Sequence, residues 1–208
     1  MARNKMTVTG IILAAGTSAR MHPENKLLLK YKSHTIIEET LAQMMKSNVA
    51  DIIIVTGHEQ ERIKSLLRKH LNDRVRCIHN PDYRLGRAES IKCAIRHVAD
   101  RADAALFMVA DKPGVTTALI NRAIDRYVAD RPAVLYVETP NGRGHPIIFS
   151  KSLFDNLLTL EGDLVGNELV SKYADNLVKL NDATPQIDID NEQDYRILLQ
   201  TDAGRETA

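Results

Sequence analysis

The sequence predicts an α/β fold in which a mostly parallel sheet carries helices on both faces. Three observations support this prediction. Apolar runs rich in Val, Ile and Leu alternate with helical patterns over most of the chain, as they do in β–α–β units. The runs lack a polar alternation, which is typical of strands buried on both faces. Several of them end in small or acidic residues, at the sheet edge where open parallel sheets bind their ligands.

The first part of the chain begins with a strand. Residues 7–15 form an apolar, β-branched run that ends at Gly16. Residues 35–48 then place apolar side chains three and four positions apart, which predicts a helix. Residues 51–57 repeat the strand pattern and end in glycine, and residues 59–71 predict a helix with one apolar side.

The middle of the chain repeats this alternation with one interruption. Residues 75–80 predict a third strand, and the segment 81–90 breaks the pattern with proline, glycine and charged residues. Residues 90–99 have helical spacing again. Residues 104–111 predict a fourth buried strand, which ends in an aspartate, and residues 116–129 predict the next helix.

The last part of the chain departs from strict alternation. Residues 133–138 and 145–150 predict two strands around a turn rich in glycine, proline and asparagine. Residues 150–180 are expected to be mainly helical. Residues 183–200 then predict a short strand and a terminal helix, and we expect residues 201–208 to be frayed.

Composition limits the classes of protein that fit. With 208 residues, 44% of them hydrophobic and 26% charged, we expect one globular domain over residues 1–208, with residues 150–180 on its acceptor side. The net charge of +1 argues against an obligate nucleic-acid binder. We expect neither a secretory signal nor a membrane span, because no apolar run is long enough. Cys77 and Cys93 are expected to be reduced thiols in a cytoplasmic protein.

The turn after the first strand carries the strongest chemical signal, in GIILAAGTSARMHPENKLLL. Small residues around Gly16 let backbone N–H groups approach an anion, and Arg20 and Lys26 add charge that suits phosphates. The stretch has the glycine spacing of neither a Walker loop nor a dinucleotide fingerprint. The residues alone therefore fit a phosphate-binding loop and an ordinary turn with a solvated arginine and lysine equally well.

Carboxylates near later strand ends suggest a metal site. Asp111 ends a buried strand, and a carboxylate there could hold Mg²⁺, which prefers oxygen ligands. Pro113 follows closely, so a role in a turn or helix cap is the alternative. Asp188 and Asp190 alternate in the expected short strand and would point the same way. Either could complete a metal site with Asp111, and Asp190 could instead cap the last helix.

A histidine lies in the turn NGRGHPIIF. His145 is flanked there by Gly144 and Pro146, with Gly142 nearby. A lone histidine in a turn serves a structural role or, because the glycines leave the backbone open, contacts a substrate.

Five motifs follow one another over nearly the whole chain: LAAGTSARMHPENKLLL, GRAES, VADKPGVT, GRGHPIIF and DIDNEQDY. In this order they resemble the MobA-like NTP transferases, and most of all the branch of molybdenum cofactor cytidylyltransferases. The resemblance implies a Rossmann-like, three-layer fold of the nucleotide-diphospho-sugar transferase type. It also implies a Mg²⁺-dependent reaction that joins an NTP to a phosphorylated acceptor, here a molybdopterin-type cofactor, and releases pyrophosphate. The sequence LAAG, in place of LAGG, favours CTP.

The same resemblance implies roles for individual residues. Arg20 and Lys26 would stabilise the triphosphate during catalysis, and Asp111 with Asp190 would bind Mg²⁺. His145 would lie near the acceptor or the metal. The residues expected to contact the nucleotide are Leu13, Ala14, Ala15, Gly16, Gly86 and Ser90.

The chain also departs from the pattern of that family. His22 replaces a glycine, and Lys112 stands where the cofactor branch often has glutamine. The stretch GDLVGNEL lacks an arginine where the acceptor should bind. Two alternatives therefore stay open. One is transfer to another phosphorylated acceptor, such as a sugar phosphate or phosphoalcohol. The other is a non-catalytic protein that binds a nucleotide or cofactor and serves a molybdoenzyme or its chaperone.

Overall fold

A computed structural model of the chain describes residues 6–21, 24–162 and 176–203. Seven strands form one sheet in the order β5-β4-β1-β6-β8-β7-β9, and β2 and β3 form a small separate hairpin. The strands of the large sheet are β1 (Val8–Ala14), β4 (Ile52–Thr56), β5 (Val75–His79), β6 (Ala104–Val109), β7 (Val134–Thr139), β8 (Gly142–Ser150) and β9 (Leu177–Asn181); the hairpin consists of β2 (Lys30–Tyr31) and β3 (His34–Thr35). β8 alone pairs antiparallel with its neighbours β6 and β7. The prediction of a mostly parallel sheet is therefore confirmed.

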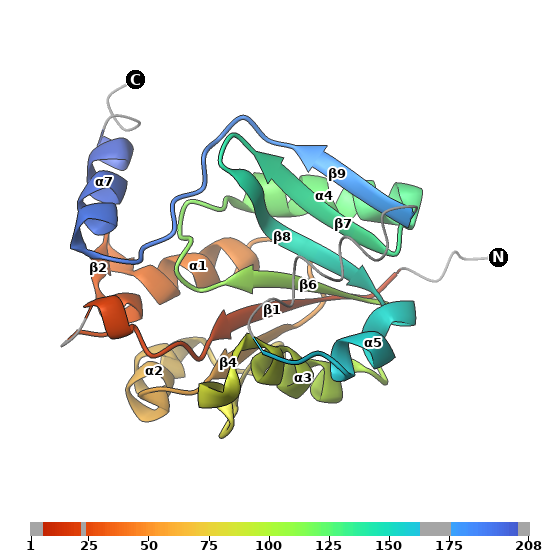
Figure 1. The fold of residues 1–208 in the computed structure, drawn as a ribbon, viewed down its shortest axis with the longest axis horizontal. Helices are drawn as coiled ribbons and strands as arrows, with labels where there is room; N and C mark the ends of the chain where they lie inside the picture. The colour runs from red at the N-terminus through yellow and green to blue at the C-terminus, as the bar shows by residue number, and fades with distance from the viewer. Residues whose placement is uncertain (1–5, 22–23, 163–175, 204–208) are drawn as a thin grey trace.

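Helices cover both faces of the sheet. They are α1 (Ile36–Met45), α2 (Gln60–Leu67), α3 (Arg87–Val98), α4 (Thr117–Asp130), α5 (Phe154–Leu158) and α7 (Glu192–Ala203). Buried side chains of α1, α2, α4 and α7 share one hydrophobic cluster with the sheet, and those of α3 and α5 share a second cluster. Figure 1 shows α3 and α5 next to each other, with α7 at the opposite side of the view beside the small hairpin. This is the three-layer arrangement that the sequence predicts.

The apolar runs of the central strands follow from this layering. Ile11 packs into the cluster on the α3 side, and its neighbour Ile12 packs into the other. Ile53 and Ile54 on β4 divide in the same way, and all four side chains have no exposed surface. Successive side chains of a strand point to opposite faces, so a strand covered on both faces must be apolar at every position.

Two predicted elements are wrong in part. The helix expected at 90–99 begins three residues earlier, at Arg87, directly after Gly86. The turn expected before residue 145 is shorter, because β8 already starts at Gly142 and pairs with Thr139 of β7.

The C-terminal third differs most from the prediction. The stretch expected to be helical over 150–180 contains α5 but ends in β9, which pairs in parallel with β7; residues 163–175 lie outside the described residues. No strand forms at 183–191 within the described part of the chain. The alternation there reflects an extended segment that buries Ile189 in the core.

The last helix extends farther than expected. α7 includes residues 201–203, which we expected to be frayed, and residues 204–208 lie outside the described part. Among the described residues, none of the helices combines the length and the apolar character needed to cross a membrane.

Candidate active site

A cleft of 1260 Å³ opens at the sheet edge where β1, β4 and β6 end. Because β8 runs in the opposite direction, its first residues lie at the same edge. Every residue that the sequence predicts for the site lines this cleft: Leu13, Ala14, Ala15, Gly16, Arg20, Lys26, Gly86, Ser90, Asp111, His145 and Asp190. The structure thus brings these residues together, and their individual roles remain predictions.

The loop after β1 is tied to the segment that carries Lys26. Ser18, at a φ of 52°, donates its hydroxyl hydrogen to Asn25 Oδ1 over 3.2 Å and accepts the backbone N–H of Lys26 over 3.3 Å. Asn25 is 4% exposed, and its Oδ1 also accepts the backbone N–H of Leu27. These hydrogen bonds cap the start of the short helix Lys26–Leu28 and hold the main chain of Lys26 against the loop after β1.

Gly16 lies in this loop with open space beside it. Apart from its two chain neighbours, no atom of the described residues comes within 4 Å of the position that a Cβ would occupy. Packing against the protein therefore does not require a glycine here. A ligand bound close to the backbone would require a glycine, because any side chain would project into the space that the ligand needs.

Cations and carboxylates meet across the cleft. Lys26 Nζ lies 2.5 Å from Asp111 Oδ2 and 3.6 Å from Asp190 Oδ1. Arg20 Nη2 lies 2.9 Å from the same oxygen of Asp190. The side chains of Lys26 and Asp111 are only 15% and 18% exposed, so this pair is shielded from solvent, whereas Arg20 is largely exposed.

The two aspartates of the C-terminal segment have different partners. Asp188 Oδ1 pairs with the buried Lys112 over 3.1 Å, and Asp190 shares Lys26 with Asp111. The alternative role of Asp190 as a helix cap is wrong, because Asn191 Oδ1 accepts the N–H of Asp194 at the start of α7. The Asp190 side chain is therefore available to the cleft.

The donor set suits a hard divalent cation. Within the described ranges no three histidine, cysteine, aspartate or glutamate side chains cluster as metal ligands do. Asp111 and Asp190 both approach one ammonium group, so their carboxylates face a common point. Two carboxylates completed by water and substrate phosphates are a typical set of ligands for Mg²⁺. The residues present fit such an ion.

His145 is held at both its backbone and its ring. Its N–H donates to Gln186 Oε1 over 2.8 Å, and its carbonyl accepts from Gln186 Nε2. Nδ1 lies 3.2 Å from the carbonyl oxygen of Phe107 and must donate to it, because a carbonyl only accepts. Burial, reinforced by the charge of Lys112, lowers the pKa of His145 to about 4. The ring is therefore neutral near pH 7.

Gly86 and Ser90 have structural roles at the opposite wall. Gly86 adopts a φ of +121°, and a Cβ there would meet the carbonyl carbon of Gly162 at 3.0 Å. The hydroxyl oxygen of Ser90, which is buried, accepts a hydrogen bond from Asn80 Nδ2 over 3.0 Å. Both residues line the cleft, and the nucleotide contacts expected of them stay predictions.

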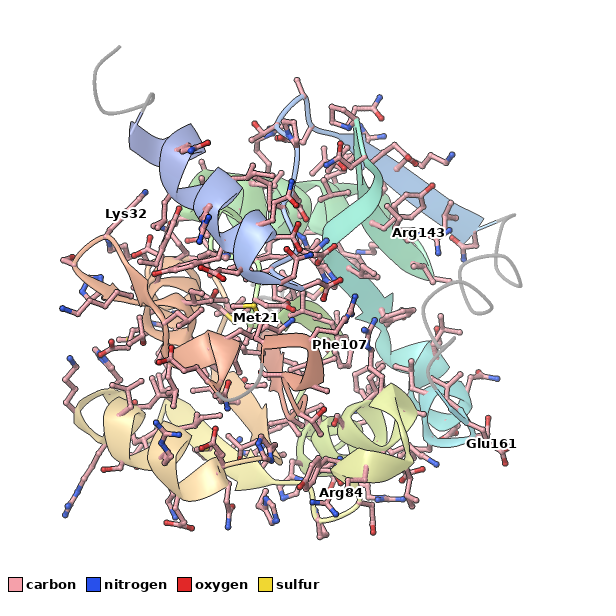
Figure 2. All side chains as sticks on the ribbon, turned by 60° about the vertical axis from the view of Figure 1, so that its left-hand side comes forward. Met21, Lys32, Arg84, Phe107, Arg143 and Glu161 are labelled. Carbon is pink, nitrogen blue, oxygen red and sulfur yellow. The ribbon has the colours of Figure 1, made fainter. Side chains whose placement is uncertain are left out.

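The sequence does not single out several residues that line the cleft or hold its lining. His58 and Glu59 follow the end of β4, where the rule that ligands bind beyond strand ends could have found them. Gln186, which holds His145, carries no signal in the sequence. Arg84 and Arg143 also line the cleft, and Figure 2 shows them on either side of Phe107.

Comparisons of the sequence find related proteins over most of the chain. A family model described as a MobA-like NTP transferase domain matches residues 10–177. Nicotine blue oxidoreductase of Paenarthrobacter nicotinovorans is 27% identical over 205 residues, which cover 92% of this chain and 96% of that protein. The bifunctional protein GlmU of Francisella tularensis is 27% identical over 142 residues, and the match covers 67% of this chain but only 30% of GlmU.

Comparisons with solved structures agree with the sequence comparisons. The crystal structure of Rv0371c from Mycobacterium tuberculosis H37Rv superimposes with a TM-score of 0.83 at 28% identity, covering 94% of this chain and 98% of that one. A complex of Rv0371c with manganese gives a TM-score of 0.78 at 27% identity, covering 94% and 100%. A nucleotidyl transferase from Methanothermobacter superimposes with a TM-score of 0.79 at 23% identity, covering 94% of this chain and 99% of that one. This similarity shows a shared fold.

Proposed function

The chain belongs to the MobA-like NTP transferase family, and on that premise we propose that it transfers a nucleotidyl group from CTP to a molybdopterin-type cofactor. The observation that carries this proposal is the pairing of Arg20 and Lys26 with Asp111 and Asp190 across one cleft. The open loop at Gly16 lines the same cleft. Transfer of a nucleotidyl group from a triphosphate calls for this combination of cations, metal-binding oxygens and a close backbone. A cytoplasmic location fits a reaction that uses CTP.

The reaction is a displacement at phosphorus. An oxygen of the acceptor phosphate attacks the α-phosphorus of the NTP, and the bond from that phosphorus to the oxygen bridging to the β-phosphate breaks. Pyrophosphate leaves with the bonding electrons. Because the acceptor phosphate is already a nucleophile, no strong general base is needed. Positioning and neutralisation of charge therefore supply the catalysis, with Arg20 and Lys26 binding the departing phosphates.

We propose Mg²⁺ as the metal, held by Asp111 and Asp190. The oxygen-only donor set and the manganese complex of the homologue Rv0371c support a divalent ion. When bound, such an ion neutralises charge on the phosphate oxygens. His145 is proposed to contact the acceptor through Nε2, which accepts hydrogen bonds because Nδ1 carries the proton. Residues 163–169 of the acceptor-side motif GDLVGNEL lie outside the described residues.

Pyrophosphate release tests the proposal directly. The purified protein is incubated with Mg²⁺, one of CTP, GTP, UTP or ATP, and one of molybdopterin, a sugar phosphate or a phosphoalcohol. We expect release with CTP and molybdopterin. Release with another acceptor would support nucleotidyl transfer but show that the acceptor is not molybdopterin. Tight NTP binding without release from any pair would favour the accessory, non-catalytic role for a molybdoenzyme.

Variants of the charged residues test the mechanism. Lys26→Ala and Asp111→Asn should each lower kcat by about a hundredfold or more, the scale of losing one preorganised charge partner. Arg126→Ala provides a matched control, because Arg126 forms an exposed pair with Asp130 on α4, away from the cleft. Normal turnover in Lys26→Ala with every acceptor would contradict the role of this lysine.

A redox reaction is the second candidate. The similarity to nicotine blue oxidoreductase extends over 92% of this chain, which favours it. The absorbance of nicotine blue, followed in the presence of the protein and NADPH, tests this candidate. We expect no change in absorbance, since carboxylates paired with cations beside an open glycine loop suit phosphoryl chemistry.

A further inference from the structure

We infer that Lys26 competes with the divalent metal for Asp111 and Asp190, so that one lysine couples metal binding to nucleotide binding. The inference rests on the proposed function. Lys26 Nζ is within 4 Å of an oxygen from each carboxylate, at 2.5 Å and 3.6 Å. An ammonium group and a metal ion cannot both occupy the point that these two oxygens face.

The pair is strong enough to matter in this competition. Lys26 and Asp111 are mostly shielded from solvent, where attraction between charges is stronger than at an open surface. A metal ion that binds Asp111 must therefore displace an established charge-assisted hydrogen bond. The apparent affinity for the metal is lowered by that bond.

The exchange needs movement of only one side chain. The backbone N–H of Lys26 is held by Ser18 Oγ, and Asn25 caps the short helix that Lys26 begins. The lysine stem has four flexible carbons, so the ammonium can swing while the main chain stays in place. Lys26 lines the same cleft as Gly16, which gives the released ammonium a path to phosphates bound at that loop.

The consequence is a coupling between the two ligands. A metal on Asp111 releases Lys26 to the triphosphate, and a triphosphate that attracts Lys26 frees Asp111 for the metal. Each ligand therefore raises the affinity for the other, and by thermodynamic linkage the two factors are equal.

A second ion pair in the cleft offers a matched control. Lys112 follows Asp111 in the sequence, but its ammonium pairs with Asp188 over 3.1 Å. Lys112→Met and Lys26→Met each remove one positive charge from the same cleft. Only Lys26→Met removes the competitor for Asp111.

The test measures the affinity for Mn²⁺ alone, from the free-ion signal in electron paramagnetic resonance. Lys26→Met should bind Mn²⁺ about tenfold more tightly than the wild type, because a hydrogen bond to a charged group no longer opposes it. Lys26→Arg should stay near the wild type, and Lys112→Met should change the affinity by less than about twofold. The double variant Lys26→Met/Asp111→Asn should lose the tight site. Lys26→Gln, which is polar and uncharged, repeats the measurement if Lys26→Met unfolds.

The reciprocal test measures CTP binding in EDTA. Asp111→Asn should bind CTP more tightly than the wild type, because Lys26 is released, and the double variant Lys26→Met/Asp111→Asn should lose that gain. Equal Mn²⁺ affinity in Lys26→Met and the wild type, or an equal gain in Lys112→Met, would overturn the inference. Neither result would affect pyrophosphate release by the wild type, which tests the proposed function separately.

Discussion

Packing does not require a glycine at position 16, since a Cβ there would touch no atom of the described residues beyond its chain neighbours. Gly16→Val should therefore leave the free energy of unfolding within about 0.5 kcal/mol of the wild type. The branched side chain would project into the cleft, so the affinity for CTP should fall by about tenfold or more. Thermal unfolding and calorimetric titration with CTP measure the two effects. A loss of stability with unchanged affinity would show that the loop needs glycine for its own conformation.

His145 makes the stability of the protein depend on pH. Its folded pKa of about 4 lies below the ordinary value of 6.5, so between these values the unfolded chain takes up a proton that the folded chain refuses. The free energy of unfolding should therefore fall as the pH decreases from 6.5 to 4, and this group contributes at most about 3 kcal/mol.

Comparison with His145→Gln isolates the histidine from other titrating groups. Urea unfolding at several pH values should show a shallower decline for the variant over this window. Parallel curves for the two proteins would mean that His145 accepts a proton in the folded state as readily as in the unfolded state.

The start of helix α7 positions a carboxylate of the site. Asp194 Oδ2 accepts the N–H groups of Asp190 and Asn191, which fixes the turn that presents Asp190 to Lys26. Asp194→Ala should cost about 1 kcal/mol of stability, because it removes the acceptor of the two N–H groups that precede α7. It should also weaken Mn²⁺ binding, because Asp190 is no longer held.

The matched control for Asp194→Ala lies on the same helix. Arg196→Ala removes an exposed pair with Glu192 and should change neither the stability nor the Mn²⁺ affinity measurably. If both variants bind Mn²⁺ as tightly as the wild type, Asp194 does not position Asp190.

The central strands are predicted correctly because they are buried on two faces. β1 and β4 are apolar at consecutive positions because helices cover both sides of them, and that pattern is visible without a structure. The segment 183–191 misled the prediction because burial of Ile189 also produces an alternation, although no strand pairs with it. β9 was missed because a charged residue interrupts its short sequence LVKLN, so the segment lacks an apolar run.

The same reasoning explains which site residues were predictable. Gly16 and Asp111 follow parallel strands, so the rule that ligands bind beyond strand ends finds them. Asp188 and Asp190 pair with lysines that lie far away in the sequence. These pairs depend on how the segment that carries the two aspartates crosses the cleft, and no local sequence pattern encodes that path. Gln186 holds His145 from 41 positions away along the chain, which only the folded structure shows.

At the scale of the whole molecule, ligand binding should be visible as stability. The cleft draws residues from β1, β6, β8 and the C-terminal segment, so a ligand there binds only the folded chain. CTP with Mg²⁺ at about 100 times its Kd should add about 2.7 kcal/mol, or roughly 5–10 °C in Tm for a chain of this length. Differential scanning fluorimetry measures the shift. Asp111→Asn should lose the part of the shift that Mg²⁺ adds, and a full shift in that variant would contradict its role as a ligand.

The reversed direction of β8 has one more consequence. Because β8 runs against β6 and β7, its early residues Arg143 and His145 reach the cleft from one short piece of chain, while the proposed triphosphate residues Arg20 and Lys26 come from a segment far earlier. The residue proposed to contact the acceptor and those proposed to bind the triphosphate thus lie on separate segments of the sequence. If His145 contacts the acceptor as proposed, exchanging residues 143–145 between relatives should change which acceptor is used and leave the choice of nucleotide intact.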